Sequence, residues 1–239
     1  MLNIKNFSKQ YGKTRAVDHI EFQVNDGEVC VLLGANGAGK STTIQSIVGI
    51  LKYEGSIHWD GVSTRDSETK RKISYVPEIP ALFKMLTVRE HVQYMCKAYG
   101  KEITDNEIDT LLERFDMLDK QNKFGDELSK GMMQKVSICC ALAVSPDLLI
   151  LDEPMVGLDP KAIKELRDVI QSLKNEGKTI IISTHMLEMV DALWDRVVML
   201  KQGRVIGNYT RDEGSDKDLE DLYFSLNVEK KEEEIQHEL

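Results

Sequence analysis

The chain has 239 residues, of which 41% are hydrophobic and 30% are charged, and this suits one large α/β domain or a domain with a subdomain. Its net charge is −9. Nucleic-acid-binding proteins usually have an excess of basic residues on one face, so we expect no nucleic-acid partner. We see no signal peptide and no apolar run near the roughly 18 residues that a membrane span requires, so we expect a soluble or peripheral protein.

The N-terminal third of the chain predicts strands. Apolar and polar residues alternate over residues 2–7 and 20–24, a pattern typical of antiparallel strands with one solvated face. Residues 56–59 form a further strand pattern that ends at Asp60-Gly61, a hairpin turn signal. Residues 73–76 form another short strand pattern.

A glycine-rich segment lies between a strand pattern and a helix pattern. The apolar run 28–33 precedes it, and it reads Gly-Ala-Asn-Gly-Ala-Gly-Lys-Ser from Gly34 to Ser41. Ile44, Ile47 and Val48 follow at the spacing of a helix packed on one face. A plain glycine turn is the structural alternative, but strand, glycine loop and helix together indicate a phosphate-binding loop.

The chemistry of such a loop is electrostatic. Backbone N–H groups surround phosphate oxygens, and the N-terminus of the helix adds its partial positive charge. Lys40 can reach the β- and γ-phosphates, and the Ser41 hydroxyl can ligate Mg²⁺. Thr42 stands where a dinucleotide fingerprint requires its third glycine, so that reading is weak. We therefore expect phosphate contacts from Gly34, Ala35, Asn36, Gly37, Ala38, Gly39, Lys40, Ser41 and Thr42.

The middle of the chain is helical in pattern. Capping boxes at residues 87–90 and 104–107 predict the starts of two helices, and a third is expected to begin at Ser129. Because strand patterns flank this block on both sides, we predict a helical subdomain over about residues 80–145.

The last third alternates between strand and helix patterns. The apolar runs 147–151 and 179–182 are typical of buried parallel strands. Asp159 and Pro160 supply the N-cap and the first residue of a helix between them. Residues 197–206 predict a hairpin turning at Gln202-Gly203.

Two carboxylates and a histidine follow the buried strands of this last third. Asp152 and Glu153 end the first strand and His185 ends the second, and functional residues of parallel sheets gather at that edge. We expect Asp152 to hold Mg²⁺ through water and Glu153 to polarise the attacking water in phosphoryl transfer. We expect His185 to contact the γ-phosphate. The alternatives are solvated turn carboxylates and a structural histidine.

The ordered set of motifs resembles the ATP-binding subunit of an ABC transporter over about residues 1–210. The resemblance implies an α/β P-loop NTPase of ABC type, with a mixed central sheet, an N-terminal antiparallel β subdomain and a helical subdomain carrying the signature motif. It implies ATP and Mg²⁺ as cofactors. In chain order the motifs are the Gly34–Ser41 loop, Glu78, residues 128–132, Asp152-Glu153, residues 157–159 and His185.

Further site residues follow from the resemblance alone. It implies that Tyr11 stacks on adenine with Val17 nearby, and that Glu78 joins Ser41 and Asp152 at the metal. Lys40, Glu153 and His185 would be the catalytic residues.

The same resemblance implies a second ATP-binding subunit, identical or different. Ser129 and Gly131 of the signature motif would bind the γ-phosphate that this second subunit holds, and Asp159 lies in the loop that communicates across the dimer. A helix N-terminus with Ser and Gly is an anion site in its own right. Two ATP molecules would lie between the two subunits in a head-to-tail dimer.

The chain departs from the family pattern at three positions. The family usually has Gln where this chain has Glu78, and its signature usually reads Leu-Ser-Gly-Gly-Gln where this chain has Lys130 and Met132. The extra charge of Glu78 is expected to tighten metal binding. These changes concern the turnover rate more than nucleotide binding.

An apolar run directly follows Glu78. In ABC subunits the membrane partner docks here, so Leu82, Phe83 and Met85 are candidates for contact with an integral membrane permease; a loop packed into the core is the alternative. The pattern of residues 75–92 is similar to bacterial ABC-2-type exporter subunits that pair with a separate membrane chain. That resemblance implies a peripheral protein at the cytoplasmic face of the cell membrane.

Two other functions are compatible with the same motifs. A soluble ABC-type ATPase engaged in cofactor assembly and a low-turnover binding subunit are the alternatives, and intact Lys40, Asp152, Glu153 and His185 argue against the second. The sequence names neither the cargo nor the direction of transport.

The last segment, residues 211–239, is an acidic tail. It contains 11 acidic and 4 basic residues, and its charge-rich end is expected to be disordered. Four apolar residues fit one helical face, which predicts a short helix: Leu219, Leu222, Tyr223 and Leu226.

Overall fold

The structure is a computed structural model, and it describes residues 1–186 and 190–211. Its smaller sheet is antiparallel with the strand order β2-β1-β4-β5, as the alternating N-terminal patterns predict. The four strands are β1 (Leu2–Tyr11), β2 (Thr14–Val24), β4 (Glu54–Trp59) and β5 (Val62–Ser63).

The larger sheet has the strand order β10-β9-β3-β8-β7-β6. All neighbouring pairs are parallel except β9 and β10, which form an antiparallel hairpin at one edge. The predicted mixed central sheet is therefore confirmed. Its strands are β3 (Val29–Leu33), β6 (Ile73–Val76), β7 (Leu148–Asp152), β8 (Thr179–Thr184), β9 (Arg196–Lys201) and β10 (Arg204–Thr210).

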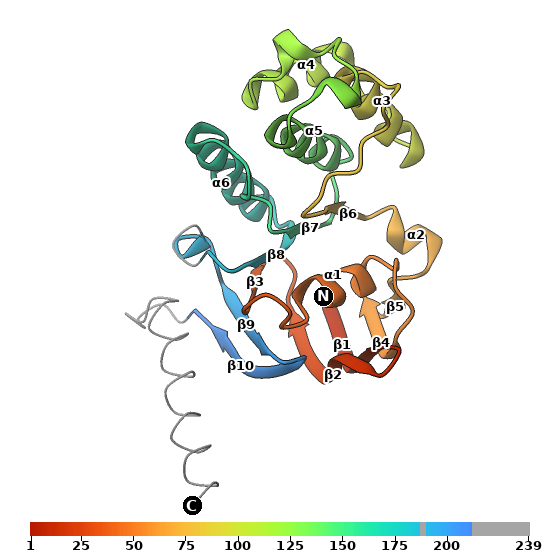
Figure 1. Ribbon diagram of the computed structural model, residues 1–239, viewed down its shortest axis with the longest axis vertical. Helices are drawn as coiled ribbons and strands as arrows, with labels where there is room; N and C mark the ends of the chain where they lie inside the picture. The colour runs from red at the N-terminus through yellow and green to blue at the C-terminus, as the bar shows by residue number, and fades with distance from the viewer. Residues whose placement is uncertain (187–189, 212–239) are drawn as a thin grey trace, which may run out of the picture.

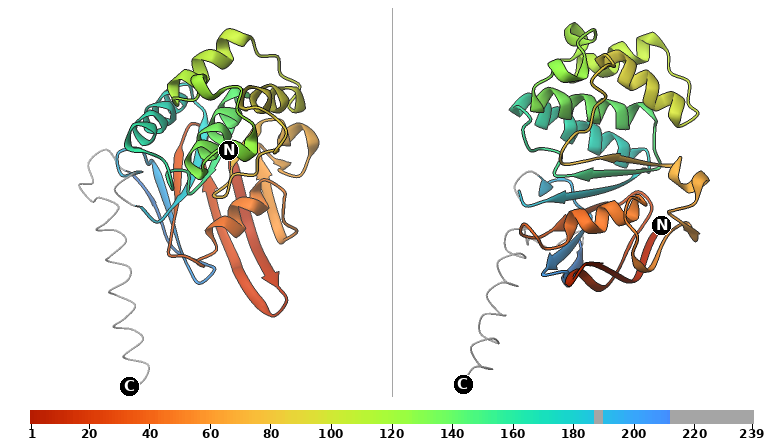
Figure 2. Two further views of the ribbon diagram at one scale, coloured as in Figure 1. Left: turned by 45° about the horizontal axis from the view of Figure 1, so that its top comes forward. Right: turned by 45° about the vertical axis from the view of Figure 1, so that its right-hand side comes forward.

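Helices cover both faces of the larger sheet. Figures 1 and 2 show α3 to α6 on one side and α1, with the antiparallel sheet beyond it, on the other. The helices are α1 (Lys40–Ile47), α2 (Ser67–Lys70), α3 (Val88–Ala98), α4 (Asp105–Arg114), α5 (Lys130–Ala143) and α6 (Pro160–Asn175), with 3₁₀ turns at Leu118–Lys120 and Gly125–Glu127.

The side chains of β3 alternate between two hydrophobic cores, and this explains its uninterrupted apolar run. Val29, Val31 and Leu33 pack into the core beneath α3 to α6, whereas Cys30 and Leu32 pack into the core shared with α1 and the antiparallel sheet. Because each face of the sheet is covered, every side chain of the strand is buried. β7 and β8 divide their side chains in the same way.

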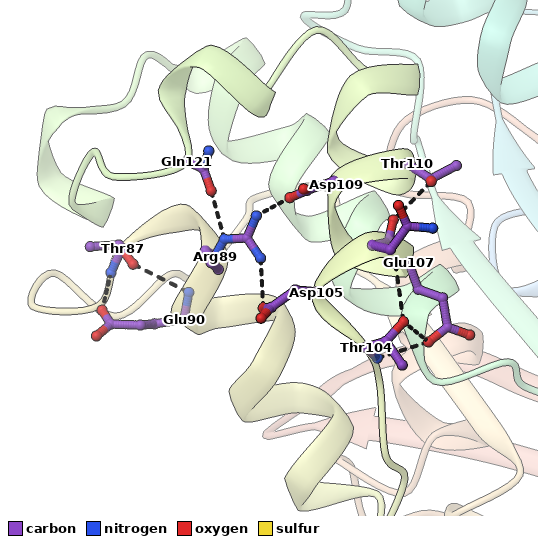
Figure 3. Close-up of polar contacts among 10 residues, drawn as sticks. Thr87, Arg89, Glu90, Thr104, Asp105, Glu107, Asp109, Thr110 and Gln121 are labelled. Atoms are coloured by element: carbon purple, nitrogen blue, oxygen red, sulfur yellow. Dashed lines mark hydrogen bonds and ion pairs between the residues drawn. The ribbon is translucent and has the colours of Figure 1, made fainter.

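The helical segment is held together by polar contacts at its helix starts. Thr87 and Thr104 cap α3 and α4 in reciprocal capping boxes with Glu90 and Glu107, as predicted. Figure 3 shows that Arg89, in the first turn of α3, reaches three partners beyond its own helix. These partners are Gln121 at 2.6 Å from Nε, Asp105 at 2.9 Å from Nη1, and Asp109.

Some elements differ from the sequence prediction. β1 and β2 run beyond the predicted ranges 2–7 and 20–24, because register shifts after Ile4 interrupt the alternation of buried and exposed residues. α2 and β5 are too short to give a periodic signal. The predicted helix of the acidic tail lies outside the described residues, and the proposed domain limits at 80–145, 1–210 and 211–239 stay predictions.

Within residues 1–186 and 190–211, none of the helices has the length and apolar character needed to cross a lipid bilayer.

The capping box of α4 generates a stability prediction. Thr104→Ala removes the hydroxyl that accepts a hydrogen bond from Glu107 N, so we expect the free energy of unfolding to fall by about 1 kcal/mol in chemical denaturation. Thr110→Ala is the matched control, since the Thr110 hydroxyl donates only to Asn106 O within the helix. Equal losses in the two variants would contradict the capping role.

Candidate active site

Three neighbouring parallel strands bring the predicted motifs to one edge of the larger sheet. β8 lies between β3 and β7, with Leu33 beside Thr184 and Asp152 beside Ser183. Since the strands are parallel, their carboxyl ends lie together. The glycine loop follows β3, Glu153 follows β7 and His185 follows β8.

The glycine loop curls between β3 and α1 in a conformation that requires glycine. Gly39 caps α1 with φ of +107°, and a Cβ there would lie 3.0 Å from Ala16 O. The next residue, Lys40, is 6% exposed. Its ammonium donates to Gly34 O at 2.7 Å and lies 3.2 Å from Glu153 Oε1.

Asp152 is held by two hydroxyl groups. Ser41 Oγ donates to Asp152 Oδ1 at 3.1 Å, and Ser183 Oγ donates to the same oxygen. Burial raises the pKa of Asp152, the hydrogen bonds from Ser183 and Ser41 oppose this, and the charges of Glu78 and Glu153 raise it further.

Ser183 is a residue of this site that the sequence analysis missed. A signal was present, because Ser183 is a hydroxyl in a fully buried strand after three isoleucines, and a buried polar group needs a partner.

Glu153 has a backbone conformation that is uncommon outside glycine, with φ of +47°. Its N–H donates to Ser183 O and Oγ, each at 3.1 Å. The side chain is buried, with Oε1 facing Lys40 and Oε2 lying 3.0 Å from His185 Nδ1. A strained residue persists where its surroundings over-determine it, and such residues cluster at active sites.

Lys40, Ser41 and Glu153 line a cavity of about 440 Å³, whereas Asp152 and Ser183 lie behind its wall; this volume is within the range of small-molecule sites. The structure brings the glycine loop, Glu78, Glu153 and His185 together there. Ala16 and Val156, which the sequence analysis did not name, complete the wall. The lining residues are Ala16, Ala35, Asn36, Gly37, Gly39, Lys40, Ser41, Thr42, Glu78, Glu153, Val156 and His185.

The two residues expected near adenine lie outside this lining. Tyr11 is the last residue of β1 and is 46% exposed, with the Lys9 ammonium 4.8 Å from its ring centre. Val17 is buried in the core beside Gly39, so its neighbour Ala16 borders the cavity instead.

The signature segment does not reach the glycine loop of its own chain. Ser129 caps α5 by accepting a hydrogen bond from Met132 N at 3.3 Å. A Cβ on Gly131 would lie 2.5 Å from Gly157 O. Neither Ser129 nor Gly131 lines the cavity, and both stand at the start of α5.

Asp159 is tied to α5 rather than to the cavity. Its carboxylate accepts a hydrogen bond from Ala162 N at 2.9 Å and forms an ion pair with Lys135 Nζ at 2.6 Å. The hydrogen bond from Lys135 lowers the pKa of Asp159. Together with the Gly131–Gly157 contact, this pair joins the start of α5 to the segment that follows Glu153.

The apolar run after Glu78 is only partly buried. Leu82 packs against the core beneath the helices, whereas Phe83 is 53% exposed and Met85 is 80% exposed. The buried ring of His91 holds this run in place, because Nε2 accepts a hydrogen bond from Phe83 N at 2.9 Å. No pattern in the sequence predicts this role of His91, because the contact joins a loop to the helix that follows it.

Comparison with known protein families agrees with this arrangement. The family model described as ABC transporter matches residues 17–156. The chain is 36% identical over 240 residues to the ABC-type transporter ATP-binding protein EcsA of Bacillus subtilis (strain 168), covering 96% of this chain and 97% of that protein. It is also 36% identical over 226 residues to the lantibiotic transport ATP-binding protein SrtF of Streptococcus pyogenes, covering 93% and 96%.

Solved structures share the fold. An ATP-binding subunit of an ABC transporter superposes with a TM-score of 0.86 at 36% identity, covering 95% of this chain and 99% of that one. The cassette MJ0796, described as a dimeric post-hydrolysis state bound to ADP and Pi, gives 0.79 at 27% identity, covering 89% and 100%. The chain therefore belongs to the ATP-binding subunits of ABC transporters and is an ATPase of that family.

Proposed function

We propose that the chain binds and hydrolyses ATP between two ATP-binding subunits and drives a separate membrane subunit of an exporter. The observation that carries the catalytic part is the buried contact between Lys40 and Glu153, 3.2 Å apart at the wall of the cavity. This contact places Lys40, which we expect to bind the phosphates, beside Glu153, which we expect to polarise the attacking water. Relatives described as lantibiotic transport and bacitracin transport ATP-binding proteins support the transport part.

The residues around Ser41 fit a bound Mg²⁺. Ser41 and Asp152 present a hydroxyl and a carboxylate 3.1 Å apart, and Glu78 adds a second carboxylate at the cavity wall. Mg²⁺ prefers such oxygen ligands, and when bound it would offset charge on the phosphates. Ser41, Asp152 and Glu78 would hold it.

Glu153 and His185 are assigned to the water and the γ-phosphate. Glu153 Oε2 is within hydrogen-bond distance of His185 Nδ1, and His185 Nε2 would donate to a phosphate oxygen when both ring nitrogens carry a proton. The glycine loop and Thr42 would surround the other phosphates. Tyr11 would stack on the adenine base, with Val17 nearby behind Ala16. Glu153 would then orient water at the phosphorus.

The second half of each site would come from the other subunit. Ser129 and Lys130 are exposed at the start of α5 and lie outside the cavity of their own chain. A helix N-terminus of this kind suits a phosphate. The ion pair between Asp159 and Lys135, with the close approach of Gly131 to Gly157, would hold this helix start against the segment that follows Glu153. The dimeric state of MJ0796 supports this arrangement.

The exposed apolar run is assigned to the membrane subunit. Ile79, Phe83 and Met85 are 74%, 53% and 80% exposed, and Tyr94 contacts the Phe83 ring edge-on. Contiguous exposed apolar side chains mark interaction sites. With Leu82 behind them, they would bind a permease at the cytoplasmic face of the membrane, and the relatives described as transport proteins favour this partner over one in cofactor assembly.

The first functional prediction concerns hydrolysis. Glu153→Gln keeps the shape of the side chain and removes its charge, so we expect kcat for ATP hydrolysis to fall by about 10²- to 10⁴-fold while ATP binding persists in equilibrium titration. Glu113→Gln, an exposed carboxylate of α4, is the matched control. Undiminished hydrolysis by Glu153→Gln would overturn the assignment of Glu153.

The second functional prediction concerns the dimer. In a Glu153→Gln background, ATP should produce a dimer in sedimentation velocity. Adding Lys130→Glu places a negative charge at the start of α5, and we expect the dimer to weaken about tenfold, or by about 1.4 kcal/mol. Lys101→Glu reverses an exposed charge elsewhere and should leave it intact. Equal dimerisation of the two double variants would contradict a phosphate site at this helix start.

The third functional prediction concerns the membrane partner. Phe83→Asp places a charge on the exposed apolar run, so we expect the share of the chain that sediments with membranes of its host cell to fall strongly. Val62→Asp is the control, because Val62 is similarly exposed, at 48%, on β5. Undiminished membrane association of Phe83→Asp, with ATP hydrolysis intact, would count against this docking surface.

A further inference from the structure

The charges around the nucleotide cavity are unbalanced. Glu78 and Glu153 line it, and Asp152 lies behind Ser41. Lys40 is the only lysine or arginine among the described residues that line it. The Lys40 ammonium already faces Glu153 Oε1 at 3.2 Å, so much of its positive charge is compensated before a phosphate arrives.

The three carboxylates differ in how they are held. Asp152 accepts hydrogen bonds from Ser41 and Ser183, and Glu153 contacts Lys40 and His185. In contrast, no hydrogen bond or ion pair joins the Glu78 carboxylate to another residue within 1–186 or 190–211. Glu78 is exposed at the cavity wall, and its charge reaches inward far enough to raise the pKa of Asp152.

An uncompensated carboxylate has opposite effects on a bare nucleotide and on its metal complex. Like charges repel, so Glu78 disfavours a triphosphate that arrives without a cation. A divalent cation reverses the sign of this contribution, because it lies between the anions and attracts both. A neutral side chain of the same shape would not repel the bare triphosphate, and its amide oxygen would attract the cation more weakly than a carboxylate does.

We propose that Glu78 makes nucleotide binding conditional on a divalent cation, repelling metal-free nucleotide and favouring the metal complex. This rests on the proposed function, since it takes the cavity to be the ATP site. Glu78 is thereby a specificity-determining residue that selects the charge state of the nucleotide.

The test is a binding measurement on the full chain with the non-hydrolysable analogue AMP-PNP. Its Kd is determined by isothermal titration calorimetry at fixed ionic strength, in Mg²⁺ and in EDTA, for the wild type and Glu78→Gln. We expect the variant to bind more tightly than wild type in EDTA and more weakly in Mg²⁺. The ratio of the Kd in EDTA to the Kd in Mg²⁺ should be at least about tenfold larger in the wild type than in Glu78→Gln. This difference corresponds to about 1.4 kcal/mol of coupling between the cation and the Glu78 charge.

Two further variants make the result specific. Glu113→Gln removes the same charge from an exposed position on α4 and should reproduce the wild-type ratio. Glu78→Ala removes the charge together with the side chain and should repeat the tighter binding in EDTA. An equal ratio in the wild type and both Glu78 variants would overturn the proposal. Failure of every protein to bind AMP-PNP in Mg²⁺ would instead overturn the assignment of the cavity as the nucleotide site.

Discussion

The parallel alignment of β3, β8 and β7 is the constraint on which the rest of the molecule depends. Their hydrogen-bond register sets Leu33 beside Thr184 and Asp152 beside Ser183, so three segments far apart in the sequence end at one edge. Each strand is buried on both faces by the two cores. The helices that cover the sheet therefore stabilise the site indirectly, because their packing against both faces fixes the positions of these strands.

The site itself is an unfavourable place for charge. Lys40 and Glu153 are each 6% exposed as side chains, and taking two ions out of water costs much of what their attraction returns. Glu153 also has positive φ. Such features are poor evidence for stability, and the two hydrophobic cores are the better explanation of why the fold holds. The strained and buried charges instead indicate chemistry at this edge.

Local signals in the sequence predict local structure well here. The capping boxes of α3 and α4, the Asp159-Pro160 start of α6 and the apolar run of β7 all lie where predicted, because each depends on neighbours within a few residues. The bulges of β1 depend on its pairing with two other strands. They therefore have no local pattern in the sequence that would predict them.

The residues of the candidate site also differ in whether nearby residues or distant contacts determine their positions. The glycine loop and the Asp152-Glu153 pair are contiguous motifs, and the structure brings them together as expected. Ser183 and His91 act through contacts across strands or between a loop and a helix, and no spacing rule identifies them. The separation of Ser129 from the cavity is likewise a property of the folded chain.

The contact between Gly131 and Gly157 has a consequence for how this sequence can vary. A single methyl group on Gly131 would meet the Gly157 carbonyl at 2.5 Å, and the Lys135–Asp159 ion pair binds the same two segments a turn further on. A bulkier residue at position 131 therefore requires the backbone at Gly157 to move, whereas a Cβ on Gly157 would meet nothing within 4 Å and is disfavoured only by the φ of +83°. The backbone of the segment after Glu153 thus limits which residue can occupy position 131, although the two lie far apart along the chain.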